Sequence, residues 1–385
     1  MQLINTAIKS ERPARFFSVE TLLQGFSIVY GMLVHLKTAA FDRKIPPHKK
    51  LPCAVISIGN ITVGGTGKTP MTIYLARLVT SFGYRVVILS RGYKGRSERT
   101  GGIVSNGEAL LMSPAQAGDE PYMMASTLKG VPVVVGRNRY EAGNRAITAF
   151  SPDVILLDDG FQHIQLARDI NLVLVDHHRP FGNRHLLPRG PLREPVSALE
   201  RADIIIETRC DIPIKPGMEL ENTMRQLSLK TRVFQSGHIP DIVNIVSGKR
   251  PTLSILRTSG QGCSLSLLQG KRIFVFSGIA DNRNFHRTLT GIGCLLSGLK
   301  EFPDHYEFSG SDLAAVAHTA IEKKADLIVT TQKDAARIPK DLHWPLDLVV
   351  IGITPTLHAQ TDDFNHYLKN KLSIRIPGVS PHASA

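Results

Sequence analysis

The sequence predicts an α/β fold in which a mostly parallel sheet carries helices on both faces. A smaller C-terminal α/β domain follows this sheet, and an N-terminal amphipathic helix precedes it. Short apolar runs bounded by turn residues alternate with helical patterns such as residues 70–82. The runs are continuously apolar, as strands buried on both faces are. A second series of the same kind begins at Arg272, so we expect two domains.

Size and charge limit the classes of partner. The 385 residues are enough for two domains, each with its own core. Lys and Arg number 46 against 33 Asp and Glu, a net charge of +13 that attracts anionic lipids, phosphorylated metabolites or nucleic acid. No basic tract is interleaved with aromatic residues, which argues against nucleic acid. Nothing in the sequence indicates an obligate protein partner.

The first predicted element is an amphipathic helix at residues 21–36, within an N-terminal segment 1–50 that ends in a basic linker. One apolar stripe recurs at helical spacing: Leu22, Phe26, Val29, Leu33 and Leu36. The run is shorter than the ~20 apolar residues of a membrane span, and it is interrupted by polar residues. Basic residues flank it at positions 9, 12, 15, 37, 43, 44, 49 and 50. We therefore expect the helix to lie on an anionic membrane surface.

Two other interpretations of this helix exist. The stripe can pack against the protein's own core, as amphipathic helices generally do. The basic segment, the apolar run and Lys37-Thr38-Ala39-Ala40 also resemble a signal peptide. We reject the signal peptide because a candidate ATP site begins shortly after it, and exported proteins meet no ATP.

The first domain, residues 51–226, opens with a strand at 53–58 and a glycine-rich loop. The loop ends in Gly67-Lys68-Thr69 and precedes a helix predicted to begin at Pro70. In this setting backbone N–H groups and the lysine bind phosphates, and the threonine hydroxyl binds Mg²⁺. The strict pattern has glycine where Thr62 stands, so the loop is a variant. We predict a P-loop NTPase-like site whose nucleotide-binding residues are Thr62, Gly64, Gly65, Thr66, Gly67, Lys68 and Thr69.

Five further runs predict the other strands of this domain, at residues 85–89, 131–135, 154–157, 171–175 and 203–206. The run 154–157 leads into Asp158-Asp159, which places two carboxylates at the carboxyl edge of the sheet. A P-loop needs such an acidic partner to hold its metal ion. We expect Asp158 and Asp159 to bind Mg²⁺ with Thr69, although a strand-end aspartate can also simply cap the next turn.

Three other segments carry polar side chains suited to catalysis or binding. Asp119 stands beside a second carboxylate in a turn where a base could face the γ-phosphate, but the pair also fits an ordinary surface turn. His305 stands at a strand end, where structural histidines are common. The rigid loop 186–195 contains Arg189 and Arg193, which suit either a phosphate clamp or a solvated surface.

The rest of the chain predicts a connector, residues 227–270, and the smaller C-terminal domain, residues 271–385. Two weak strands and a Ser/Gly/Leu mixture mark the connector. The strands of the smaller domain are expected at residues 272–278, 326–330 and 346–352. The four cysteines, at positions 53, 210, 263 and 294, form no Cys-x-x-Cys pair, so they indicate neither a zinc site nor a disulfide framework. We expect thiols in a reducing compartment.

Eight segments together resemble the tetraacyldisaccharide 4′-kinases, the lipid A 4′-kinases of Gram-negative bacteria. They occur in the family's order over nearly the whole chain: GNITVGGTGKTP (59–70), LSRGYKG (89–95), GDEP (118–121), DDGFQH (158–163), LLPRGPLREP (186–195), FSGIADNRNF (276–285), FPDHYEF (302–308) and TTQKDAAR (330–337). The combination is highly specific. It implies transfer of the γ-phosphate of ATP to the 4′-hydroxyl of a tetraacylated glucosamine disaccharide 1-phosphate, in lipid A biosynthesis.

The resemblance also implies a place of action and catalytic roles. The enzyme would be peripheral on the cytoplasmic face of the bacterial inner membrane, where its lipid substrate resides. Asp119 matches the family's catalytic base and His305 its dyad partner, since a sugar hydroxyl needs a carboxylate to take its proton. The two fall in different predicted domains, so we expect closure to assemble the site. Candidates for a substrate or phosphate clamp are Arg91, Arg193 and Glu194.

The sequence departs from the family's pattern at two positions. Gln332 stands where many relatives have glutamate, which puts an essential carboxylate there in doubt. Arg189 replaces the usual alanine and offers an additional phosphate contact. Two other classes are alternatives: a membrane-recruited nucleotide-switch ATPase or GTPase, and a peripheral membrane module with a degenerate site. Gln332-Lys333-Asp334 only faintly matches the guanine-reading Asn-Lys-x-Asp of a switch.

Overall fold

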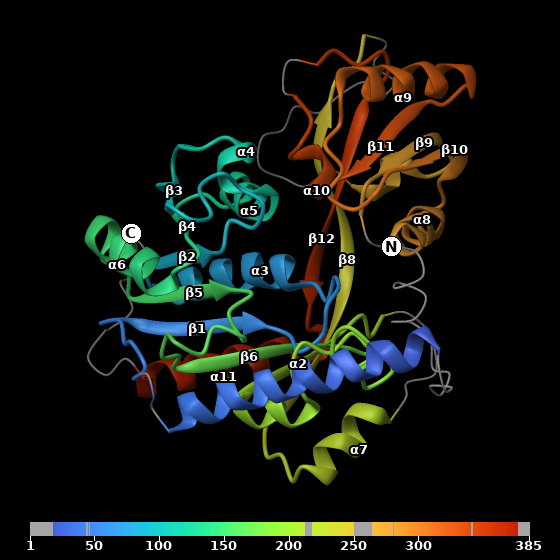
Figure 1. Ribbon diagram of the computed structural model, residues 1–385. Coiled ribbons are helices and arrows are strands. Elements are labelled where there is room, and N and C mark those ends of the chain that lie inside the picture. Colours follow the sequence, from blue (N-terminus) through green and yellow to red (C-terminus); the bar gives the residue numbers. More distant parts are fainter. Residues whose placement is uncertain are drawn as a thin grey trace. The chain divides into compact units, whose positions relative to one another are not determined.

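The computed structural model describes residues 18–43, 45, 47–211, 218–249, 264–279, 281–339 and 342–375 (Figure 1). The chain forms two compact units. The first unit contains residues 1–238 and 355–385, and the second contains residues 239–354. Each unit has its own helices, and the strand Arg232–Val246 takes part in the strand order of both.

The first unit is built on a mostly parallel sheet with strand order β8-β7-β6-β1-β5-β2-β4-β3. Strand β3 pairs antiparallel with β4, and the other pairs described in this unit are parallel. The strands are β1 (Ala54–Gly59), β2 (Val86–Ser90), β3 (Gly102–Ser105), β4 (Val133–Val135), β5 (Val154–Asp158), β6 (Ile170–Asp176), β7 (Ile204–Thr208) and β8 (Arg232–Val246). Every residue of β1, β2, β4, β5 and β7 is buried, which confirms the predicted mostly parallel, doubly covered sheet.

Helices cover both faces of this sheet. They are α3 (Lys68–Ser81), α4 (Pro114–Ala117), α5 (Asp119–Thr127), α6 (Arg139–Phe150), α7 (Glu219–Gln226) and α11 (Thr361–Arg375), with short 3₁₀ turns at Val196–Arg201 and His358–Gln360. Helix α6 packs on the face that includes Val55 and Ile155. Their neighbours Ile56 and Leu156 point to the opposite face and are equally buried. The core therefore has two layers, one on each side of the sheet.

The second unit is a smaller parallel α/β structure with strand order β10-β9-β11-β12-β8. Its elements are β9 (Arg272–Ser277), β10 (Leu295–Glu301), β11 (Leu327–Thr331), β12 (Leu348–Thr356), α8 (Asn282–Gly291), α9 (Gly310–Glu322), α10 (Gln332–Ala335) and a 3₁₀ turn at Leu265–Leu268. Helix α8 packs with Ile273 and Val275, whereas α9 packs with the alternate residues Phe274 and Phe276. The two helices therefore cover opposite faces, as predicted for an α/β domain.

The compact units differ from the predicted domain boundaries in two places. Within the predicted connector 227–270, β8 is a continuous strand of 15 residues that belongs to both units. Its burial is irregular, so its sequence gives a weak strand pattern. Helix α11 belongs to the first unit rather than to a domain ending at 385, because its Phe364 packs edge-on against Phe234 of β8. Residues 250–263 of the predicted connector lie outside the described residues.

Helix α2 (Val19–Asp42) is longer than the predicted segment 21–36. It has 24 residues and begins at Ser18, whose side chain accepts a hydrogen bond from the Thr21 N–H. By length and composition alone, Val19–Phe41 is long and apolar enough to cross a membrane, so the prediction that it is too short is wrong. The basic residues at positions 9, 12, 15 and 44 lie outside the described residues.

One face of α2 docks on the rest of the first unit, and its buried residues are both apolar and polar: Leu23, Ser27 and Phe41. Ser27 Oγ donates to the Leu186 carbonyl at 2.7 Å, and Tyr30 Oη donates to the Arg193 carbonyl at 2.9 Å. Lys37 Nζ donates to the Gln162 carbonyl. The predicted apolar stripe points elsewhere, since each of its residues is more than half exposed: Leu22, Phe26, Val29, Leu33 and Leu36. The alternative in which this stripe packs on the protein's own core is therefore wrong.

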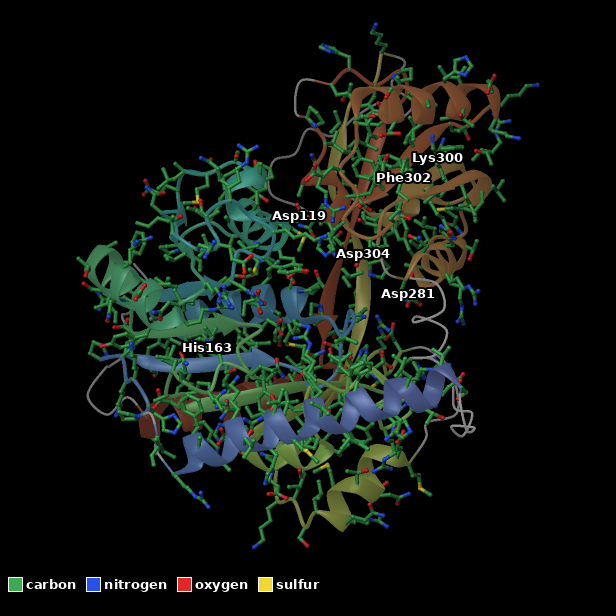
Figure 2. The ribbon with its side chains drawn as sticks, in the orientation of Figure 1. Asp119, His163, Asp281, Lys300, Phe302 and Asp304 are labelled. Carbon is green, nitrogen blue, oxygen red and sulfur yellow. The ribbon has the colours of Figure 1, made fainter. Side chains whose placement is uncertain are left out.

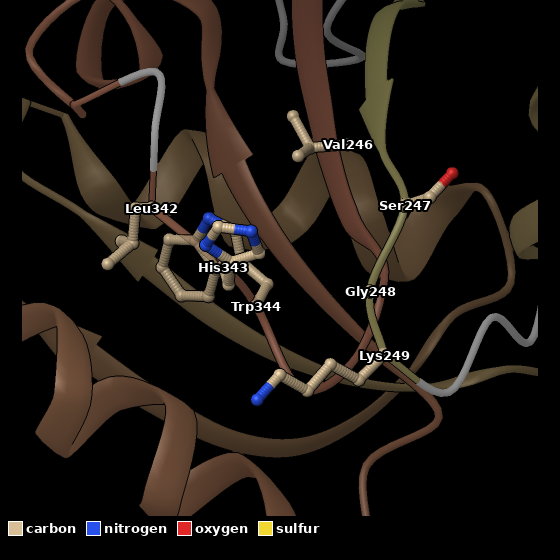
Figure 3. A pocket seen from close by; sticks show the side chains of 7 residues that line it. All are labelled: Val246, Ser247, Gly248, Lys249, Leu342, His343 and Trp344. Atoms are coloured by element: carbon tan, nitrogen blue, oxygen red, sulfur yellow. The ribbon is translucent and has the colours of Figure 1, made fainter.

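The second unit also contains a pocket of about 370 Å³ (Figure 3). It lies between the end of β8 and the segment before β12, and its lining residues are Val246, Ser247, Gly248, Lys249, Leu342, His343 and Trp344. Trp344 is buried and stacks on Phe276 of the core. None of the residues predicted for catalysis or nucleotide binding lines this pocket.

Candidate active site

The loop between β1 and α3 has the conformation of a phosphate-binding turn. Gly64 and Gly67 have φ angles of 117° and 84°, which residues with side chains rarely adopt. Helix α3 begins at Lys68, so the loop ends at a helix N-terminus, where backbone N–H groups favour an anion. Thr62 instead forms an antiparallel bridge with Leu192. This extended pairing needs no glycine and explains the departure from the strict pattern.

Asn60 holds the two ends of this loop together. Its fully buried side chain donates to Thr66 Oγ1 at 2.9 Å and accepts from Lys68 Nζ at 3.3 Å. Lys68 Nζ also lies 3.6 Å from Asp159 Oδ1. The sequence analysis missed Asn60, although a polar residue directly after a buried strand is a sign that could have found it.

Asp158 ends β5 and lies buried beside the P-loop. Its Oδ1 accepts from Thr72 Oγ1 at 3.2 Å and its Oδ2 from Ser90 Oγ at 3.0 Å. Burial, followed by the charges of Glu120 and Asp159, raises the pKa of Asp158 to about 7. Buried carboxyl and hydroxyl oxygens next to a phosphate loop are the ligands that Mg²⁺ prefers, so the residues present fit this ion.

Asp159, the next residue, has the opposite electrostatic environment. It adopts a left-handed conformation with φ of 48°. Both its carboxylate oxygens accept from Arg193 Nη1 at 3.1 Å. Burial alone would raise the pKa of Asp159, but the charges of Lys68, Arg193 and Arg139 outweigh burial and lower it. The two adjacent aspartates therefore have different environments. Asp158 lies among hydroxyl and carboxylate groups, and Asp159 lies among cations.

The segment that carries Arg193 and Glu194 runs alongside the P-loop. The Arg193 N–H donates to the Ile61 carbonyl at 2.8 Å. Gln162 Nε2 donates to Glu194 Oε1 at 3.0 Å and to the Asn60 carbonyl at 2.7 Å. Glu194 is also closely paired with a neighbouring arginine at position 201. The predicted clamp residues Arg193 and Glu194 thus lie beside the phosphate loop.

Arg189 lies in the same loop, and its side chain is only 1% exposed. The additional phosphate contact expected for it is therefore not supported, because a phosphate group would have to enter the interior of the loop. Its carbonyl accepts from Asn183 Nδ2 at 3.1 Å. We interpret Arg189 as a residue that supports the fold of the loop.

Asp119, labelled in Figure 2, is the first residue of α5. Its position depends on close backbone packing. Gly118 before it has a φ of 88°. A Cβ atom on Gly95 would lie 2.6 Å from the Gly118 nitrogen, so glycine is required where the LSRGYKG segment meets the GDEP segment. Glu120, also in the first turn of α5, raises the pKa of Asp158. The first turn of α5 is therefore close enough for the charge of Glu120 to act on Asp158.

Two arginines complete the surroundings of the aspartates. Arg139 begins α6 and is 4% exposed, and its Nη1 donates to the Gly136 carbonyl at 2.9 Å. Burial lowers the pKa of Arg139 to about 10, against the charges of Asp158 and Asp159. Arg91 pairs with Glu98 at 2.7 Å and acts electrostatically on Arg139. The sequence analysis predicted Arg91 but missed Arg139, although an arginine shortly after an apolar run could have indicated it.

His305 lies in the second unit, where the segments 276–285, 302–308 and 330–337 meet at the carboxyl ends of β9, β10 and β11. Its Nε2 lies 3.2 Å from Lys333 Nζ, which also pairs with Asp304 at 3.2 Å. The His305 N–H donates to the Gly278 carbonyl, and the Gly278 N–H donates to Asp334 Oδ2. His305 and Asp119 belong to different units, and each is placed within its own unit.

Comparison with known proteins identifies the family. A family model described as tetraacyldisaccharide-1-P 4′-kinase, LpxK, matches residues 19–373. The tetraacyldisaccharide 4′-kinase of Syntrophus aciditrophicus is 43% identical over 82% of this chain and 84% of its own length. That of Desulfatibacillum aliphaticivorans is 39% identical over 96% of this chain and 98% of its own length.

A solved structure agrees with these relatives. The crystal structure of LpxK from Aquifex aeolicus in complex with ATP superimposes with a TM-score of 0.70 and 29% identity. The match covers 92% of this chain and all of that chain. Sequence and fold thus lead to the same family, and the chain belongs to the tetraacyldisaccharide-1-P 4′-kinases.

Proposed function

We propose that this chain transfers the γ-phosphate of ATP to the 4′-hydroxyl of a tetraacylated glucosamine disaccharide 1-phosphate, a step in lipid A biosynthesis. The observation that carries the proposal is the family match across both units, together with a P-loop whose lysine and carboxylates lie side by side. Lys68 lies 3.6 Å from Asp159, and this proximity supports a role for the lysine in binding the terminal phosphates.

In this proposal the P-loop residues bind ATP. The loop N–H groups between Thr62 and Thr69 would surround the phosphates, and Lys68 would contact the terminal ones. Thr69, Asp158 and Asp159 would hold Mg²⁺, which supplies positive charge to the transferring phosphoryl group. The raised pKa of Asp158 supports this assignment, because a buried carboxyl with carboxylate neighbours gains most from an added cation.

Asp119 would act as the general base. It would accept the proton of the 4′-hydroxyl while the sugar oxygen bonds to the γ-phosphorus and the bond to the β–γ bridging oxygen breaks, leaving ADP. His305 would orient or tune this carboxylate. Its contacts with Lys333 and Asp304 support such a role, since a histidine held among charged groups has a defined orientation. Arg91, Arg193 and Glu194 would position the acceptor or its phosphate.

The membrane is the proposed place of action. The acyl chains of the acceptor keep it in a bilayer, and the exposed apolar stripe of α2 would bring the enzyme to that bilayer. The net charge of +13 favours an anionic lipid surface. Because ATP is a cytoplasmic substrate, the proposed location is the cytoplasmic face of the inner membrane.

The nucleotide-switch alternative finds no support in the second unit. A guanine-reading aspartate must reach the base, but Asp334 is fully buried and bonds with Thr331, Gly278 and Arg337. Lys333 is paired with Asp304. The Gln332-Lys333-Asp334 segment therefore belongs to an internal network.

The proposal is tested by incubating the enzyme with γ-labelled ATP and the acylated disaccharide 1-phosphate in mixed micelles. We expect the label in a lipid product that carries a second phosphate. Label recovered only as free phosphate would show an ATPase and would contradict the proposed transfer.

A further inference from the structure

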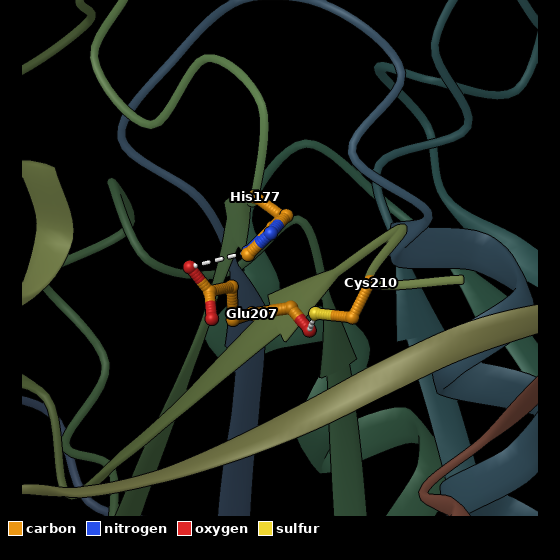
Figure 4. Close-up of side chains that lie close together, drawn as sticks. All are labelled: His177, Glu207 and Cys210. Atoms are coloured by element: carbon orange, nitrogen blue, oxygen red, sulfur yellow. Dashed lines mark hydrogen bonds and ion pairs between the residues drawn. The ribbon is translucent and has the colours of Figure 1, made fainter. Parts of the chain in front are cut away.

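Three potential metal ligands meet at the carboxyl ends of β6 and β7, apart from the proposed catalytic residues. His177 follows β6, Glu207 lies in β7, and Cys210 follows β7. One ligand atom from each lies within 4.8 Å of the others (Figure 4). The spacing of cysteines in the sequence does not indicate this group, because two of its three ligands are not cysteines.

The environment of His177 indicates that this group binds a ligand. Its side chain is 7% exposed, and Nδ1 lies 2.9 Å from Glu207 Oε1. This approach lacks hydrogen-bond geometry, and in the part of the chain that the structure describes Nδ1 has no hydrogen-bond partner. The contact with Glu207 is an ion pair only when the ring is protonated. A neutral ring leaves the buried Nδ1 without a hydrogen bond, which is costly unless something else binds it.

Glu207 is held so that one oxygen faces the histidine. It is 7% exposed, and its Oε2 accepts from Gln235 Nε2 at 3.2 Å. Carboxylates that bind metals are commonly fixed through their second oxygen in this way. The Cys210 thiol donates to the Glu207 carbonyl at 3.3 Å, so the sulfur also lies against this residue.

We propose that His177, Glu207 and Cys210 bind one Zn²⁺ ion, with water as the fourth ligand. Nitrogen, sulfur and carboxylate oxygen are the ligands of tetrahedral zinc, whose bonds of about 2.0–2.3 Å place ligand atoms roughly 3.3–3.6 Å apart. The ligand atoms now lie within 4.8 Å of one another, so binding would require them to move closer together. The thiol proton leaves to solvent as the metal–sulfur bond forms. Sulfur disfavours Mg²⁺, so this site is distinct from the proposed ATP metal site.

The proposed zinc site is connected to the P-loop through Arg209. This residue stands directly before Cys210, and its Nη2 donates to the Gly65 carbonyl at 2.7 Å. Its Nη1 pairs with Asp176 at the end of β6 at 2.8 Å. A metal ion that ties Cys210 and Glu207 to His177 would therefore fix the segment that carries Arg209 and stabilise the conformation of the loop.

Cobalt titration of the full-length protein tests the site directly. Protein stripped with a chelator is titrated with Co²⁺, whose bond to a thiolate gives a near-ultraviolet charge-transfer band. We expect one equivalent to produce the band, Zn²⁺ to remove it and Mg²⁺ to leave it unchanged. Cys210→Ser should abolish the band, whereas Cys53→Ser, a matched control at another partly buried cysteine of the first unit, should keep it.

A second variant tests whether the loss of the band in Cys210→Ser comes from the lost ligand and not from a folding defect. Glu207→Gln is nearly isosteric, and we expect it to weaken Co²⁺ binding by about tenfold or more while the melting temperature of the metal-free protein stays close to that of the parent. A missing band in the parent protein, or a band that survives Cys210→Ser, would overturn the proposal. Neither outcome depends on ATP or lipid, so this test is separate from the test of the kinase function.

Discussion

At the scale of single residues, Asp158 and Asp159 show how position alone differentiates two identical side chains. Asp158 accepts from Thr72 and Ser90 in a buried environment, and its pKa is raised to about 7. Asp159 faces Lys68 and Arg193, and its pKa is lowered. The first is therefore the carboxyl whose charge state changes near neutral pH.

This difference predicts a pH-dependent stability. The folded pKa of Asp158 lies above the unfolded value of about 3.9, so the stability it contributes is present below pH ~4 and is lost as pH rises through about 7. The difference corresponds to roughly 4 kcal/mol at most. We expect Asp158→Asn to raise the melting temperature of the metal-free protein at pH 8 but not at pH 4, and to abolish phosphoryl transfer. Thermal unfolding at both pH values checks this, and equal shifts at both would contradict the assigned pKa.

The second prediction at this scale concerns Asp119. As a general base it acts on the chemical step, so Asp119→Ala should lower kcat by about 10²–10⁴-fold and leave ATP affinity nearly unchanged. Steady-state kinetics with the lipid acceptor, together with equilibrium binding of an ATP analogue, separate the two quantities. An equal loss of ATP binding would instead place Asp119 in the metal site.

Residues with a strong local signature were predictable from the sequence, and polar residues without one were not. The P-loop and the Asp158-Asp159 pair were visible because glycines and strand-end carboxylates mark them directly. Asn60 was missed although its side-chain partners, Thr66 and Lys68, are close in the sequence. Arg139 was missed because its importance arises from charges on residues distant in the sequence. The charge on Arg139, for example, matters only because α6 brings it close to the end of β5.

At the scale of elements, helix α2 has two faces with different roles. Its docked face is held by hydrogen bonds from Ser27, Tyr30 and Lys37 to loop carbonyls. Periodicity predicted the apolar stripe correctly but not which side would dock, because the docking partners are backbone groups over a hundred residues away. The exposed stripe is therefore available for a membrane.

We predict that Phe26→Glu with Leu33→Glu releases the protein from anionic liposomes. Both side chains are more than half exposed, so the double variant should unfold at nearly the parental temperature. Thr21→Glu with His35→Glu adds the same charge at exposed positions outside the stripe and serves as the matched control. Sedimentation with liposomes measures binding. A double variant that stays bound would show that another surface of the protein binds the membrane.

Tyr30 connects helix α2 to the proposed site, because it donates to the carbonyl of Arg193, whose side chain donates to Asp159. We expect Tyr30→Phe to cost about 1 kcal/mol of stability and to lower kcat severalfold without changing liposome binding. Unfolding in urea, turnover and sedimentation give the three quantities. Unchanged turnover would mean that α2 and the Arg193 segment act independently.

At the scale of the whole molecule, the chain consists of two α/β units joined by β8 and β12. The fold class was predictable because each unit repeats a local pattern of buried strands and covering helices. The boundaries were not, because α11 is separated from the rest of the first unit by the entire second unit. Only tertiary contacts such as Phe234 with Phe364 reveal that connection.

The proposed dyad gives a prediction at this scale, since Asp119 and His305 belong to different units. If His305 acts through Asp119, then His305→Ala should lower kcat in the parent but have little further effect in the Asp119→Ala background. The four variants of this double-mutant cycle are compared by turnover at saturating ATP and lipid. Multiplicative losses would show that His305 has a separate role.

The central claim is that this chain phosphorylates one hydroxyl of a lipid disaccharide. The most direct measurement compares ATP consumed with lipid phosphorylated, using the tetraacylated disaccharide 1-phosphate and its 4′-deoxy analogue. The account predicts one phosphate transferred for each ATP consumed with the first lipid and no transfer to the second. Transfer to the 4′-deoxy analogue, or ATP hydrolysis that proceeds equally without lipid, would contradict it.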